Sequence, residues 1–103
     1  ISSSSLVDDL KAQNAEVESL LASGSLGGIY VPALRAKDLA LEIQSTQPAA
    51  RKDAIEPSVK QIVLAAYQLD NFGDVGDADK ARDAFRAMST AVTQLVSLVS
   101  ESR

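Results

Sequence analysis

The spacing of the apolar residues is the feature that most constrains the fold of this chain. They recur every three or four positions through four long stretches, and no segment alternates apolar and polar residues for the length of a strand. Such a recurrence places side chains on one side of a helix, whereas a half-buried strand needs a period of two. The spacing therefore predicts an all-α protein. The clearest apolar stripe, close to a heptad repeat, comprises Ala81, Ala84, Phe85, Met88, Val92, Leu95 and Val99.

Residues that break or cap helices separate these stretches. The four predicted helices span about 5–23, 30–45, 52–71 and 77–101. In the third, we expect Pro57 in the first turn, where its missing N–H costs nothing, while Asp53 offers an alternative cap for an earlier start. Gly73 is expected to end this helix, Gly76 to form the turn, and Asp77 to cap the fourth helix.

Chain length and loop length together select the architecture. Four helices with short connections in 103 residues predict a single domain, folded as an antiparallel up-down-up-down four-helix bundle. A domain of this size buries roughly two-thirds of the surface of its unfolded chain, so its core needs neither a metal nor a disulfide. The expected apolar face of the second helix comprises Ala33, Leu34, Ala40, Leu41 and Ile43.

The residue types that the chain lacks exclude several kinds of chemistry. There is no Cys, no His and no Trp, and there is a single Met. This composition excludes disulfides, thiolate zinc sites, His-ligated metal or haem, and Cys or His nucleophile–base pairs within these residues. A Ser nucleophile needs a base, and Lys60 follows Ser58 by two positions, which places it on a different side of the helix. We therefore expect no enzymatic activity and no cofactor.

Charge and aromatic content argue against nucleic-acid and membrane partners. Lys and Arg number 10 against 14 Asp and Glu, a net charge of −4, whereas nucleic-acid binders normally present a basic surface. The aromatic residues do not interleave with Lys or Arg as a base-stacking platform requires. No apolar run approaches the ~20 residues of a membrane span. We expect no nucleic-acid partner and no membrane span.

An acidic group surrounds the turn between the third and fourth predicted helices. It comprises Asp70, Asp74, Asp77 and Asp79. Hard cations such as Ca²⁺ bind several carboxylate oxygens from one loop, so Asp70, Asp74 and Asp77 are candidate metal ligands. The spacing is not that of an EF-hand, which needs acidic residues at every second position and a bidentate Glu at the twelfth. Turn formation and helix capping explain the same residues, and we favour this interpretation over a metal site.

Six further residues are candidates for contacts with other molecules. Tyr30 and Tyr67 are candidates for the rim of a ligand site, although a tyrosine at the edge of a bundle also packs there with its hydroxyl in water. Four apolar residues lie partly off the core-facing stripes and are candidates for an interaction face. These are Leu39, Leu64, Val96 and Leu98. Alternatively, their side chains widen the stripes that face the core.

The turn before the fourth predicted helix also carries a sequence motif. Residues 61–77 read QIVLAAYQLDNFGDVGD and contain the pattern LDxxGDxGD, made by Leu69-Asp70, Gly73-Asp74 and Gly76-Asp77. This segment resembles an uncharacterised family of small secreted bacterial helical proteins that are often encoded beside heavy-metal efflux components. The end of the first predicted helix, LLASGSL, looks similar too. Family members often have a His just before the second helix, where this chain has Tyr30.

The resemblance implies a periplasmic or secreted helical bundle in a metal-resistance setting. Together with the missing acid–base residues, it predicts a non-catalytic accessory or protein-interaction module associated with metal homeostasis or efflux. We expect its partner to be another protein or a second copy of the chain. The alternative is a protein that binds a small ligand or a hard cation at the acidic turn from Asp70 to Asp79.

Overall fold

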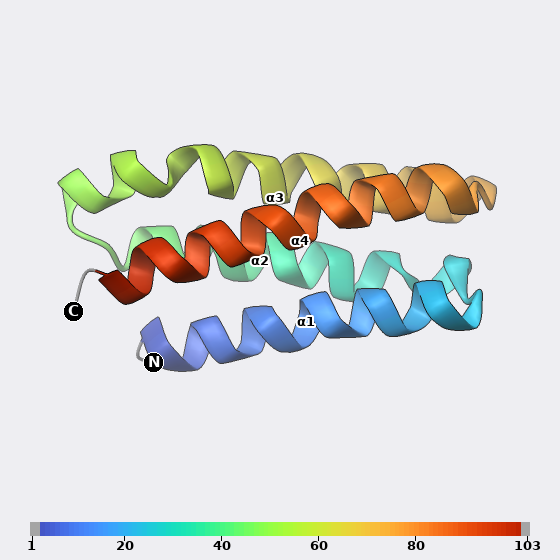
Figure 1. The fold of residues 1–103 in the computed structure, drawn as a ribbon, viewed down its shortest axis with the longest axis horizontal. Helices are drawn as coiled ribbons and strands as arrows, with labels where there is room; N and C mark the ends of the chain where they lie inside the picture. The colour runs from blue at the N-terminus through green and yellow to red at the C-terminus, as the bar shows by residue number, and fades with distance from the viewer. Residues whose placement is uncertain (1–2, 102–103) are drawn as a thin grey trace.

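Four long helices form most of the chain in the computed structural model (Figure 1). The structure describes residues 3–101 and the side chains of residues 5–100. The elements are α1 (Ser3–Ser23), a short 3-10 turn η1 (Leu26–Gly28), α2 (Tyr30–Ser45), α3 (Ala49–Val75) and α4 (Ala78–Glu101). No strand occurs among the described residues, which confirms the all-α prediction.

Successive helices run in opposite directions and lie side by side (Figure 1). α1 packs against α2, α2 against α3 and α3 against α4, and α4 returns beside α1 to close the bundle. The molecule measures 40 × 21 × 16 Å, and its long axis follows the helices. This arrangement is the predicted antiparallel up-down-up-down four-helix bundle.

The hydrophobic core lies along the inner side of all four helices. Its largest fully buried side chains are Leu10, Val17, Ile29, Ile43, Ile55, Ile62, Leu69, Met88 and Leu95. In α4, every member of the predicted stripe is buried except Phe85, which is half-buried against the core. Three fully buried alanines of α2, Ala33, Ala36 and Ala40, add little side-chain volume. Because protein interiors are close-packed, these small residues allow α2 to lie close to its neighbours.

α3 begins earlier than predicted and carries Pro57 in its interior. The helix starts at Ala49, directly after Pro48, whose backbone is extended and whose carbonyl accepts the N–H of Lys52 at 2.9 Å. Pro57 cannot donate a hydrogen bond to the carbonyl of Asp53, one turn earlier. The helix nevertheless continues through the proline, and both Asp53 and Pro57 are exposed residues. The predicted placement of Pro57 in the first turn is therefore wrong.

α3 also ends later than predicted, at Gly76 rather than at Gly73. Gly76 has a φ of 75°, the left-handed conformation that glycine adopts without steric cost. Its N–H donates to the carbonyl of Gly73 at 3.3 Å, and the N–H of Asp77 donates to that of Phe72 at 2.9 Å, which is the Schellman pattern. Asp77 then caps α4 as predicted, because its Oδ1 accepts the N–H of Lys80 at 3.1 Å. α3 therefore exceeds its predicted span at both ends.

Gly73 has a packing role in the interior of α3. It is buried, and a Cβ atom added there would lie 2.7 Å from the carbonyl oxygen of Leu26 in η1. Real Cβ atoms essentially never approach another atom this closely. Glycine is therefore the residue that lets α3 lie directly against η1, and this contact holds the beginning of α2 beside the end of α3.

Candidate interaction surface

Exposed apolar side chains concentrate on α2 and α3. Among the side chains of residues 5–100, six large apolar ones have exposed fractions between 44% and 74%, and all six belong to these two helices. They are Tyr30, Val31, Leu41, Leu64, Tyr67 and Val75. No large apolar side chain described in α1 or α4 is exposed to this degree. Isolated exposed apolar residues are normal, but their restriction to one pair of neighbouring helices marks a candidate interaction surface.

Four of these residues, Tyr30, Leu41, Leu64 and Tyr67, define what we call the α2–α3 face. Because the two helices are antiparallel, the beginning of α2 lies beside the end of α3 (Figure 1). Tyr30 accordingly lines a hollow of about 250 Å³ together with Asp70 of α3. The Tyr67 ring, three residues before Asp70, lies under the Lys37 side chain of α2. Leu64 precedes Tyr67 by three residues, so it lies on the same exposed side of α3.

A groove of about 320 Å³ continues the α2–α3 face toward the beginning of α3. Its lining residues are Leu41, Gln44, Glu56, Val59, Lys60 and Val63. Lys60 and Glu56 form an ion pair at 2.9 Å, and both of these side chains reach solvent. The apolar residues therefore follow the boundary between the two helices, with charged residues beside them.

Lys37 joins the two helices at the middle of the α2–α3 face. Its Nζ lies 3.2 Å from a carboxylate oxygen of Asp38 and 5.4 Å from the centre of the Tyr67 ring. The hydrogen bond to Asp38 raises the pKa of Lys37 above its ordinary value of 10.5, against an opposing desolvation effect, and Tyr67 contributes in the same direction as Asp38. Lys37 is therefore cationic at neutral pH. A cation over a ring contributes about 0.5–1 kcal/mol at an exposed site, which favours one orientation of Tyr67.

The structure separates the four apolar residues that were predicted to form an interaction face. Leu64 is 51% exposed and belongs to the α2–α3 face. Leu39, Val96 and Leu98 are half-buried and pack against the core, as the alternative interpretation expects. Tyr67, which was predicted to be a ligand contact, is half exposed and lies beside Leu64. Residues assigned to two different roles therefore share one surface.

Leu41 is the member of the α2–α3 face that sequence reasoning missed, because it was assigned to the core. The buried side of α2 is centred on Ala36, Ala40 and Ile43. Each residue turns the helix by about 100°, so Leu41 lies beyond the edge of that buried side. The spacing of the alanines was the signal that could have shown this.

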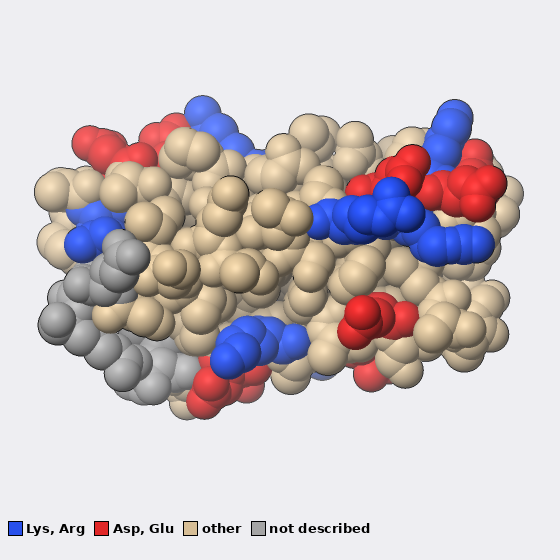
Figure 2. All heavy atoms as spheres, in the orientation of Figure 1, with Lys and Arg blue, Asp and Glu red and all other residues tan. Residues whose placement is uncertain are grey.

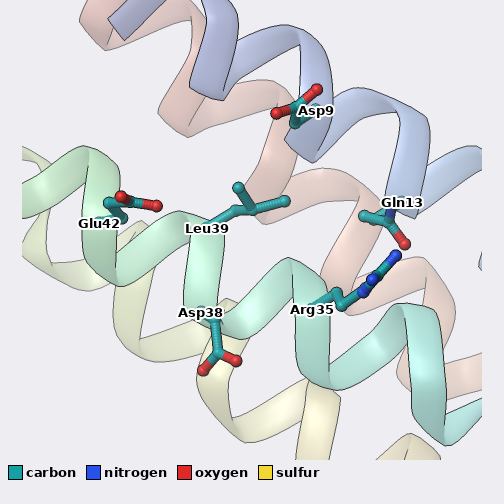
Figure 3. Close-up of a pocket in the computed structure, with 6 residues that line it drawn as sticks. All are labelled: Asp9, Gln13, Arg35, Asp38, Leu39 and Glu42. Carbon is teal, nitrogen blue, oxygen red and sulfur yellow. The ribbon is translucent and has the colours of Figure 1, made fainter. Parts of the chain in front are cut away.

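A polar hollow of about 450 Å³ lies between α1 and α2 (Figure 3). Its lining residues are Asp9, Gln13, Arg35, Asp38, Leu39 and Glu42. The Arg35 guanidinium points toward Gln13, and Leu39 projects into the hollow (Figure 3). The carboxylates of Asp9, Asp38 and Glu42 belong to exposed residues. The hollow is therefore open to solvent.

The four acidic residues around the turn between α3 and α4 do not form one cluster. Asp70 and Asp74 line the hollow beside η1, whereas Asp77 caps α4. Asp79 lies in the first turn of α4, where the helix dipole favours a carboxylate. Among the described residues, no group of three or more His, Cys, Asp or Glu could hold a metal ion. The geometry of Asp77 supports the turn-and-cap interpretation.

The boundary between α1 and α4 is more polar than the α2–α3 face. It contains a groove of about 420 Å³ lined by Lys11, Asn14, Ala15, Glu18, Val92, Thr93 and Val96. The Nδ2 of Asn14 donates to the Ser89 hydroxyl at 3.5 Å, and its buried Oδ1 has no hydrogen-bond partner. Figure 2 shows the side on which α1 and α4 face the viewer, and uncharged residues cover much of its middle.

Comparison with known proteins provides no relative for this chain. No family model matches it. No curated protein and no solved structure matches it either. The family resemblance of the LDxxGDxGD segment therefore stays a prediction. Within the part of the chain that the structure describes, no helix has the combination of length and apolar character needed to cross a membrane.

Proposed function

We propose that this chain is a non-catalytic protein-interaction module that binds its partner through the α2–α3 face. One observation carries the proposal: among the side chains that the structure describes, all six large exposed apolar ones belong to α2 and α3. Removing apolar surface from water contributes about 25 cal/mol per Å², from which the cost of ordering both partners is subtracted. A face that gathers such side chains is the part of the molecule that gains most from being covered.

The residue types of the α2–α3 face also suit an interface. Tyrosine is enriched at the centres of protein interfaces, and Tyr30 and Tyr67 each have half of their surface exposed. Lys37 already contacts the Tyr67 ring in the free chain. Because an ordered side chain loses less conformational entropy on binding, this contact lowers the cost of association.

The proposal includes a periplasmic or secreted location and an accessory role in metal homeostasis or efflux. Both rest on the resemblance of residues 69–77 to the family of small secreted helical proteins. The alternative, a hard-cation site between Asp70 and Asp79, is not favoured by a specific observation. Asp77 is engaged in capping α4, and a carboxylate in this role is accounted for without a metal.

Photo-crosslinking in cells that produce the protein tests the interaction surface. A photoreactive benzoylphenylalanine replacing Tyr67 is expected to give a crosslinked adduct of defined mass. The same replacement at Thr90, an exposed residue of α4, is the matched control and is expected to give none. Mass spectrometry of the Tyr67 adduct identifies the partner, and an efflux component among the adducts would support the proposed setting. Equal crosslinking at both positions, or none at either, contradicts the proposed surface.

A further inference from the structure

We draw no further inference here: the strongest candidate, the α2–α3 face with the hollow that Tyr30, Asp70 and Asp74 line at its end, carries none, because nothing in the structure shows what covers it.

Discussion

At the scale of single residues, three positions of the LDxxGDxGD segment meet three different structural requirements. Gly73 allows close contact with the backbone of η1, and Gly76 adopts the left-handed conformation that ends α3. Asp77 accepts the N–H of Lys80 and begins α4. These requirements are steric or depend on backbone hydrogen bonds. The motif therefore forms the connection between α3 and α4, and its Gly73 packs against η1.

Replacing Gly73 with alanine is expected to destabilise the protein although alanine is the better helix former. The added Cβ would meet the Leu26 carbonyl at 2.7 Å, and such overpacking costs about 1–3 kcal/mol. The helix propensity of alanine returns at most about 1 kcal/mol. Urea unfolding should therefore show a lower midpoint. Gly28→Ala, where an added Cβ meets nothing within 4 Å, is the control and should change stability by no more than about 0.5 kcal/mol.

At the scale of secondary-structure elements, α3 contributes both to the core and to the candidate interaction surface. Its inner side supplies Ile55, Ile62 and Leu69 to the core, and its exposed side carries Leu64 and Tyr67 of the α2–α3 face. It also continues through Pro57, where one backbone hydrogen bond is missing. Much of its stability must therefore come from packing of the inner side against the rest of the bundle.

Pro57→Ala is expected to stabilise the folded chain. Alanine restores an N–H that can donate to the Asp53 carbonyl, and proline in a helix interior costs up to about 3 kcal/mol relative to alanine. Part of the gain is lost because alanine leaves the unfolded chain more flexible, so we expect a rise of about 1–2 kcal/mol. Urea unfolding of the variant and the natural chain measures this change. An unchanged or lower urea midpoint would contradict the prediction and show that Pro57 does not destabilise α3.

At the scale of the whole molecule, the bundle closes where its first helix meets its last. Asn14 of α1 lies at this boundary, with its Oδ1 buried and lacking a hydrogen-bond partner. Val92 and Val96 of α4 line the same groove. A buried acceptor without a partner costs about 1–3 kcal/mol. The contact between α1 and α4 therefore includes one group that lowers the free energy of unfolding.

Asn14→Leu is expected to raise the free energy of unfolding by about 1–2 kcal/mol, because it removes this acceptor and adds apolar contact with α4. Thermal and urea unfolding of the variant would measure the gain. Gln94→Leu places the same side chain at an exposed position of α4 and should leave stability within about 0.5 kcal/mol of the natural protein. A destabilised Asn14→Leu variant would indicate that the groove needs its polar residue.

The number, order and direction of the helices could be predicted from the sequence, as could the buried stripe of α4 and the cap at Asp77. These features depend on the periodicity of one segment, on loop length, or on hydrogen bonds that span a few residues. The ends of α3 were predicted incorrectly for a tertiary reason. α3 continues through Pro57 at an exposed position, and inside the same helix Gly73 leaves room for the backbone of η1.

The candidate interaction surface was only partly visible in the sequence. Leu64 and Tyr67 could be singled out because they lie off the inner stripe of one helix, but Leu39 was singled out by the same criterion and packs against the core. Periodicity determined which side of each helix is apolar. Only the rotation and antiparallel packing of α2 against α3 decided that Leu41 lies outside the core and that Lys37 contacts Tyr67, because these relations join residues that are distant in sequence.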